Sequence, residues 1–235
     1  MNGTKLAAAL LLSSTAAISH AAVITLNFEN IVPFPSGNGV LVQNYYNGGT
    51  ASNGASGTNY GVAFSSGAQV LCLNSLTVKC SNTSKGGGGV AGSDKAAMFF
   101  EKVNPYMNVV AGFDTGFSMA YSNPFAANVG IQLYDGLNGT GTLLAQAPLS
   151  GTTKTCAAYG GAEYCPFASF SLGFSGVAKS VFFTGTADFS TYDDFTFGST
   201  TVGGSVAAVP EPETYALMLA GLAAVGAAAR RRKAA

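Results

Sequence analysis

The apolar residues between positions 22 and 208 come in short runs interrupted by Gly, Ser and Asn, and this pattern constrains the fold most strongly. The first run, 24–28, alternates apolar and polar side chains, which is the period of a half-buried strand. Further short runs follow at 62–64, 70–73, 98–100, 109–113, 117–121, 129–134, 167–174, 181–183 and 195–197. No amphipathic helix is indicated before Tyr215. Many short strands separated by turn residues predict an all-β sandwich or barrel.

One connection has a clear turn signature. Residues 135–141 read Asp-Gly-Leu-Asn-Gly-Thr-Gly and lie between the apolar runs 131–134 and 142–145. Asp-Gly and Asn-Gly tolerate the positive φ angles that tight hairpin turns require. We therefore expect the two runs to be adjacent antiparallel strands.

Residues 1–21 have the layout of a secretory signal peptide. Lys5 precedes the mostly apolar segment 6–18, and Ser19-His20-Ala21 ends in a small residue. The apolar segment is shorter than the roughly 20 residues that a membrane-spanning helix needs. We expect signal peptidase to cleave after Ala21 and the rest of the chain to be exported.

The chain ends in a second targeting segment, residues 209–235. Residues 209–214 are acidic and stiffened by two prolines, and residues 215–229 are uncharged. A helix of those 15 residues would be about 22 Å long, against a hydrocarbon core of about 30 Å. It spans only with local thinning of the bilayer and snorkelling of its arginines. The basic tail, 230–235, is expected to stay cytoplasmic.

The body between these ends, residues 22–208, has the length of one domain and a composition that excludes several functions. The only histidine of the chain, His20, lies in the signal peptide, and all three arginines lie in the tail. Tryptophan is absent from the whole chain. Without histidine there is no Ser-His or Cys-His couple and no imidazole metal ligand. The body carries six lysines and nine acidic residues, so its net charge is −3. Scattered lysines without arginine on an acidic body argue against nucleic-acid binding.

The four cysteines form two close pairs in a chain that is expected to be exported. An oxidising compartment favours disulfides, and four cysteines allow three pairings. We favour Cys72 with Cys80 and Cys156 with Cys165, each closing a short loop that restricts the unfolded chain by roughly 2.5–3 kcal/mol in the entropic model. The alternative, a zinc site with four thiolates, lacks a C-x-x-C spacing.

The end of the chain resembles a known sorting signal. Val209, the core Pro210-Glu211-Pro212, the following apolar stretch and the terminal Arg230, Arg231 and Arg232 resemble the PEP-CTERM signal in order and composition. The resemblance implies a Gram-negative bacterium that makes extracellular polysaccharide. It also implies transient anchoring in the inner membrane and cutting near the motif by exosortase, a membrane cysteine transpeptidase. The protein would then reach the cell surface or the extracellular space.

The body carries a second resemblance, through 27–29, 61–64, 182–187 and 192–198. These segments are similar to the jelly-roll bodies of PEP-CTERM proteins and to galactose-binding-like and carbohydrate-binding modules. The resemblance implies a single jelly-roll-like β-sandwich in 22–208. It also implies that an acid in the last strand and an acid near the first strand hold a structural calcium ion.

Here those acids are Asp193 and Glu29. Strict alternation places Asp193 on the face of Phe195 and Phe197, and a buried carboxylate needs donors or a cation. Calcium, which takes oxygen ligands, fits a body that is poor in lysine. In the alternative interpretation Asp193 lies at a solvated strand end and caps a turn.

Three functions remain open at this point. The first is a non-catalytic surface or matrix protein that binds exopolysaccharide, with Tyr45, Tyr46 and Tyr60 in Gly/Asn-rich loops stacking on sugar rings. For those tyrosines the alternative is ordinary loop packing. The second is a self-associating coat or biofilm component. The third is a glycoside hydrolase, which would need two carboxyls about 5–10 Å apart, and no spacing in the body singles out such a catalytic pair.

Overall fold

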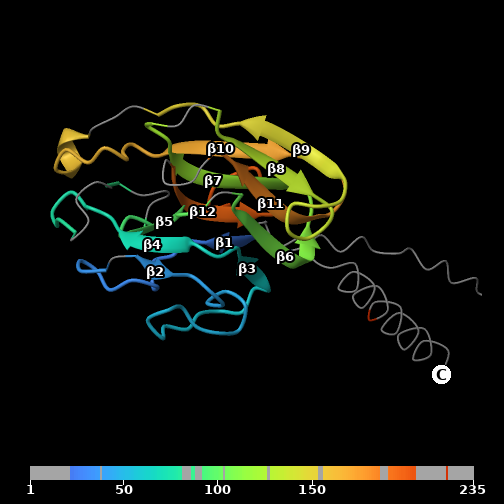
Figure 1. Ribbon diagram of the computed structural model, residues 1–235, viewed down its shortest axis with the longest axis horizontal. Coiled ribbons are helices and arrows are strands. Elements are labelled where there is room, and N and C mark those ends of the chain that lie inside the picture. The colour runs from blue at the N-terminus through green and yellow to red at the C-terminus, as the bar shows by residue number, and fades with distance from the viewer. Residues whose placement is uncertain are drawn as a thin grey trace, which may run out of the picture. The chain divides into compact units, whose positions relative to one another are not determined.

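The computed structural model describes residues 22–37, 39–80, 86–87, 92–102, 104–125, 128–152, 156–185, 190–204 and Gly221. The described body is a β-sandwich of two antiparallel sheets, so the predicted all-β fold is confirmed (Figure 1). The predicted signal peptide, residues 1–21, lies outside the described residues. The sorting motif 209–214 and the basic tail 230–235 also lie outside them, and Gly221 is the one described residue of 215–229. Among the described residues no helix has the length and apolar character needed to cross a membrane.

The larger sheet has seven strands. Its order is β10 (Ala168–Gly173), β7 (Gly116–Ser122), β12 (Thr191–Phe197), β5 (Ala96–Phe100), β4 (Ala68–Cys72) and β2 (Val40–Leu41), with β1 (Ile24–Leu26) pairing with β12 beside this path. β7 and β12 are buried along their whole length, which makes them the centre of this sheet.

The smaller sheet has five strands. Its order is β3 (Val62–Phe64), β6 (Tyr106–Phe113), β11 (Ala178–Thr184), β8 (Gly130–Tyr134) and β9 (Leu143–Pro148). A single turn of 3₁₀ helix, η1 (Ala157–Tyr159), is the only other element in this part of the chain that the structure describes.

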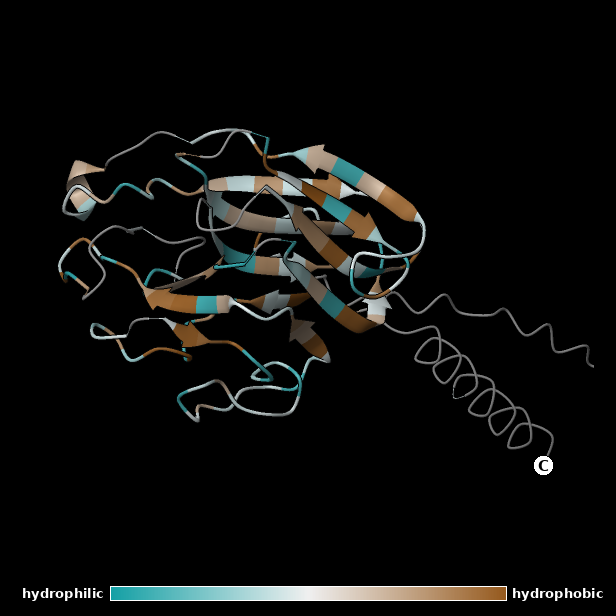
Figure 2. Cartoon of the chain, in the orientation of Figure 1, coloured by the Kyte–Doolittle hydropathy of each residue, from teal (hydrophilic) through white to brown (hydrophobic). Residues whose placement is uncertain are grey.

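Binary patterning explains why β8 takes its place in the smaller sheet. Ile131 and Leu133 are fully buried, whereas Gly130, Gln132 and Tyr134 on the opposite face are half-buried. This is the alternation of a strand with one face on the core and one towards solvent. Figure 2 shows the same change between hydrophobic and hydrophilic bands along several strands.

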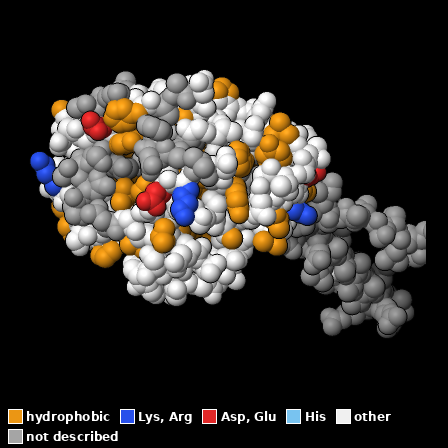
Figure 3. Space-filling model, in the orientation of Figure 1, with side chains coloured by type: hydrophobic (Ala, Val, Ile, Leu, Met, Phe, Trp, Pro, Cys, Tyr) orange, Lys and Arg blue, Asp and Glu red, His pale blue; other side chains and the backbone are white. Residues whose placement is uncertain are grey.

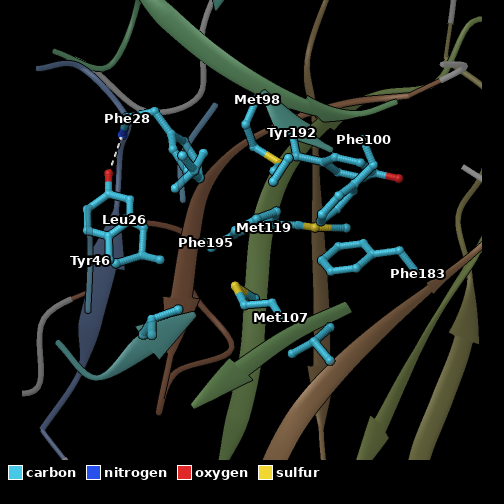
Figure 4. Close-up of a cluster of buried hydrophobic side chains, with 14 of the residues drawn as sticks. Leu26, Phe28, Tyr46, Met98, Phe100, Met107, Met119, Phe183, Tyr192 and Phe195 are labelled. Atoms are coloured by element: carbon cyan, nitrogen blue, oxygen red, sulfur yellow. Dashed lines mark hydrogen bonds between the residues drawn. The ribbon is translucent and has the colours of Figure 1, made fainter. Parts of the chain in front are cut away.

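Aromatic side chains fill the space between the two sheets. The ring of Phe195 in β12 lies 5.6 Å from Phe28, 5.5 Å from Phe183 and 5.9 Å from Phe117, measured between ring centroids. Tilted and edge-on arrangements at these distances are favourable for aromatic pairs. Figure 4 shows Phe195 among Phe183, Tyr192 and three methionines, which fill the gaps between the rings.

The predicted hairpin and both favoured disulfides are present. The backbone amides of Asp135 and Gly136 donate to the carbonyls of Thr142 and Thr140, which closes the turn between β8 and β9. Cys72 at the end of β4 is bonded to Cys80, with 6.0 Å between their Cα atoms. Cys156 is bonded to Cys165 around η1, with a Cα separation of 5.6 Å. No described cysteine is free.

The aromatic core should dominate stability. Replacing fully buried Phe195 with Ala removes its contacts and leaves a cavity, which we expect to lower the free energy of unfolding by about 3–5 kcal/mol. The matched change Phe125→Ala, at a side chain that is 39% exposed, should cost less than about 1 kcal/mol. Urea denaturation of the full chain in mild detergent measures both, and equal losses would contradict the assignment of Phe195 to the core.

Candidate functional site

The candidate acid pair lies where one edge of β12 changes partner. Thr191 and Tyr192 pair with β5, whereas 195–197 pair with β1. Between these two partners, the register of β12 against β7 shifts by one residue, and Asp194 has a φ of 50°. An extra residue in one strand at such a point is a β-bulge.

The bulge changes the face on which Asp193 lies. Tyr192 pairs with the core residue Tyr121, and its ring lies 5.9 Å from that of Phe195. Asp193 pairs with Ala120, which is outside the core cluster. The prediction that Asp193 shares a face with Phe195 is therefore wrong, because the inserted residue breaks the alternation between them.

Asp193 is fully buried, so it does not lie at a solvated strand end. The hydroxyl oxygen of Ser93 lies 3.2 Å from each of its carboxylate oxygens and 3.4 Å from the carbonyl oxygen of Asn27. The backbone amide of Asp194 donates to Oδ1 of Asp193 over 2.8 Å. Protein donors thus offset part of the cost of burying this carboxylate.

Glu29 holds the same segment of chain. Its Oε1 accepts hydrogen bonds from the backbone amides of Lys95 at 3.0 Å and Ala96 at 3.2 Å. Burial raises the pKa of Glu29, with Asp94 adding to the rise, while the two backbone bonds and the charge of Lys95 oppose it. Burial disfavours the charged form of a carboxylate, and here the opposing interactions do not fully compensate for it.

Both predicted calcium ligands therefore contact residues 93–96. The oxygen atoms near this segment come from Asn27, Glu29, Ser93 and Asp193, the hard donors that calcium prefers. Among the described residues, no cluster of three or more His, Cys, Asp or Glu side chains is placed to hold a metal. Calcium at Glu29 and Asp193 stays a prediction.

Two of the three predicted sugar-stacking tyrosines are buried. Tyr45 is only 6% exposed and Tyr46 only 5%, and their rings pack edge-on with centroids 4.8 Å apart. The hydroxyl of Tyr46 accepts a hydrogen bond from the backbone amide of Phe28 at 3.0 Å (Figure 4). For Tyr45 and Tyr46 the structure agrees with the alternative interpretation, ordinary packing, because the Gly/Asn-rich loop folds back and packs them on the core. Tyr60 is 36% exposed and stays available to a ligand.

The sequence did not reveal a groove on the outer face of the smaller sheet. Its volume is about 330 Å³, and it is lined by residues of β8, β9 and β11 that include Gly130, Gln132, Gln146, Pro148 and Thr184. Gln132 and Gln146 are directly opposite each other across β8 and β9. The alternation of β8 indicates its outer face, but only the cross-strand register brings the two amides together.

Hydrogen bonds orient these two amides. The hydroxyl of Tyr134 donates to Oε1 of Gln132 at 3.0 Å, and Nε2 of Gln132 donates to Oε1 of Gln146 at 3.1 Å. The Nε2 group of Gln146, at the end of this chain of bonds, lies on an exposed side chain of the edge strand β9. The arrangement presents a fixed donor at the mouth of the groove.

The raised pKa of Glu29 gives a testable pH dependence. Above pH 4.5, the ordinary pKa of a glutamate, Glu29 binds more protons in the folded state than in the unfolded state. The contribution of Glu29 to stability therefore falls as the pH rises from 4.5 through its folded pKa. In EGTA, we expect the free energy of unfolding of Glu29→Gln to depend less on pH than that of the wild type. Glu101→Gln, at an exposed position, is the matched control.

The same urea titrations, repeated with calcium in place of EGTA, test the predicted ion. A ligand that binds only the folded state raises stability with its concentration. Calcium should therefore stabilise the wild type and have a smaller effect on Glu29→Gln. A wild-type midpoint that calcium leaves unchanged contradicts the calcium site, and identical pH profiles for wild type and Glu29→Gln contradict the raised pKa.

Comparison with known proteins gives distant structural neighbours. A family 6 carbohydrate-binding module, whose binding subsites were dissected by crystallography and calorimetry, is 20% identical with a TM-score of 0.35, over 58% of this chain and 86% of that chain. The module CBM6cm-2 of Cellvibrio mixtus lichenase 5A, in complex with cellotriose, is 5% identical with a TM-score of 0.32, over 50% of this chain and 92% of that chain. A β-1,3-glucan-binding family 6 module from Bacillus halodurans is 14% identical with a TM-score of 0.31, over 48% of this chain and 87% of that chain.

The end of the chain matches a known family. No curated protein matches this sequence. Residues 208–233 match the family described as the PEP-CTERM protein-sorting motif, in agreement with the signal predicted in 209–235. The C-terminal segment of this chain is a PEP-CTERM sorting signal.

Proposed function

We propose that this chain is the precursor of an exported protein that exosortase processes at its C-terminal end. The match of residues 208–233 to the PEP-CTERM sorting motif carries the proposal. Residues 1–21 would direct export and be removed by signal peptidase, and residues 215–229 would hold the precursor in the inner membrane until it is cut. Two disulfides in the body support an oxidising destination at the cell surface or outside the cell.

We further propose that the mature body is a non-catalytic module that binds extracellular polysaccharide. The groove on the smaller sheet supports binding, because it combines oriented amides with half-buried aromatic neighbours on an open face. Convergent polar groups beside apolar surface are what a small-ligand site requires. On the face that Figure 3 shows, acidic and basic side chains are few among neutral ones, as suits a ligand rich in hydroxyl groups.

The positions of the acids favour binding over hydrolysis. Asp193 and Asp194 are both buried, and Glu29 already accepts two backbone hydrogen bonds. A glycosidase needs two carboxyls that reach opposite sides of a bound glycosidic bond. Because Asp193 and Asp194 are buried within β12, they cannot contact a polymer chain in this conformation.

The sorting step can be tested by a single substitution in the motif. Glu211→Ala changes the centre of the Pro-Glu-Pro core, whereas Glu213→Ala removes the same charge just outside it and is the matched control. In a host that makes exosortase, we expect the Glu211→Ala precursor to accumulate in the membrane fraction and Glu213→Ala to be processed. Immunoblots of membrane and medium fractions for an epitope in the body measure both.

Two further results decide the sorting proposal. Processing should stop for the wild type when the exosortase is deleted. If the wild type is cut equally with and without exosortase, or if the Glu211→Ala precursor is processed like the wild type, the proposed route is wrong.

Polysaccharide binding can be measured on the purified full chain in mild detergent. Native electrophoresis in gels containing dextran, galactomannan or alginate should show retardation of the protein in at least one neutral polymer. The same chain after reduction and denaturation in urea, followed by removal of urea without reoxidation, serves as the unfolded control. Mobility that none of the polymers changes would exclude the binding function and leave the sorting proposal intact.

A further inference from the structure

We propose that the groove on the outer face of β8, β9 and β11 is a subsite for a neutral polysaccharide, with the side-chain amides of Gln146 and Gln132 as its polar contacts. The proposal rests on the function proposed above and adds the site and the charge class of the ligand.

A glycine of β8 forms part of the lining of the groove. Gly130 in β8 lies between Thr184 of β11 and Pro148 of β9 in the cross-strand register. A Cβ atom at this position would lie 3.0 Å from Oγ1 of Thr184 and 3.2 Å from the carbonyl oxygen of Ala147. A glycine inside a strand weakens the strand, and one use for it is close approach by a ligand. The volume of the groove, about 330 Å³, is at the lower end of the range for ligand pockets.

The order of hydrogen bonds determines what the groove offers to a ligand. Because Tyr134 donates to Gln132 and Gln132 donates to Gln146, each amide accepts through its oxygen, and the chain of bonds ends at the nitrogen of Gln146, which lines the groove. Gln146 therefore offers N–H donors at an exposed edge. Hydroxyl and ring oxygens of a sugar accept such bonds, and donors that are already oriented lose little freedom when they bind.

Aromatic rings extend the face beyond the amides. Phe182 of β11 is directly opposite Gln132 on one side and Tyr106 of β6 on the other, so the outer row reads Tyr106, Phe182, Gln132 and Gln146. Both rings are half-buried, which leaves part of each in contact with solvent. Apolar ring surface beside hydrogen-bonding groups matches the two kinds of surface on a sugar.

The turn between β8 and β9 fixes this row. The backbone amide of Gly139 donates to Oγ of Ser180 at 3.0 Å, and Ser180 donates to the carbonyl of Gly136 at 2.6 Å. A Cβ at Gly139 would lie 2.8 Å from the ring of Phe182, so only glycine allows the turn to approach so closely. The turn therefore holds the ring of Phe182 in place before any ligand arrives.

The charge of the site selects the ligand class. None of the described residues that line the groove is ionisable, and the body carries a net charge of −3. A second groove of about 270 Å³ includes Glu101 and Lys102, so it lacks this neutral character. An acidic polymer would meet no cation in the first groove and would be repelled by the body. A neutral polysaccharide needs no cation in the groove and is not repelled by the acidic body.

A strand from a second copy of the chain is the competing occupant, because β9 is an edge strand. Exposed edges pair with other chains unless something blocks them. Pro148 ends β9 beside the groove and has no backbone N–H to offer such a partner. The polysaccharide is therefore the better occupant, and self-association becomes an outcome of the test.

The experiment compares three variants of the full chain in mild detergent, by affinity electrophoresis with dextran and galactomannan as neutral probes and alginate as the acidic one. Gln146→Leu removes the terminal donor and should weaken binding to the neutral probe about tenfold. Tyr134→Phe keeps the ring but removes the first bond of the chain, and should weaken binding about threefold. Gln69→Leu makes the same amide-to-leucine change on β4 of the other sheet and should leave binding unchanged.

The outcomes separate the site from the function. If the wild type binds a neutral probe and Gln146→Leu binds equally well, the site is wrong and the function stands. If no polymer retards the wild type, the function and the site both fail. Binding to alginate alone would contradict the proposal that the ligand is a neutral polysaccharide. If Gln69→Leu loses binding as well as Gln146→Leu, the loss is not specific to the groove and the proposed site is wrong. Sedimentation that reveals dimers of the wild type but not of Gln146→Leu would assign the groove to self-association.

Discussion

The packing of aromatic rings against β12 is the interaction on which the rest of the structure depends. Phe195 contacts rings from both sheets and from the segment after β1, so one side chain joins the two layers and the N-terminal entry. The loss of Phe195 would therefore loosen the smaller sheet as well as its own. Phe183 of β11 packs against Phe195 in the core. Phe182, the preceding residue of β11, therefore lies on the opposite, half-buried face of the strand.

Local sequence pattern was sufficient where neighbours in the chain decide the structure. The strand at 129–134, the turn at 135–141 and both disulfide loops depend on contacts between residues close in sequence, and all three were predicted correctly. The face of Asp193 was not, because the bulge in β12 arises where β5 gives way to β1. These strands are far apart in sequence, so alternation within β12 carries no trace of the change.

For Tyr45 and Tyr46, composition left sugar stacking and loop packing open, and the structure decides for packing. Gly and Asn around them are typical of exposed loops, but a loop can return its large residues to the core, and Tyr46 does so by bonding to Phe28. The groove was not predicted, because its residues carry no recognisable signal in the sequence. Gln132 and Gln146 look like ordinary surface residues in the sequence, and only the register of β8 with β9 makes them a pair.

The two polar clusters of the sandwich differ in charge and in exposure to solvent. Around residues 93–96, carboxylates lie where one edge of β12 changes partner from β5 to β1, and donors from the protein occupy much of their bonding capacity. At the groove, neutral amides form a chain that ends in a donor on an exposed side chain. A carboxylate placed there would turn away acidic polymers and bind water strongly, whereas an amide loses little when a hydroxyl replaces that water. The separation of charge from the open face is therefore the property that lets a mildly acidic body accept an uncharged polymer.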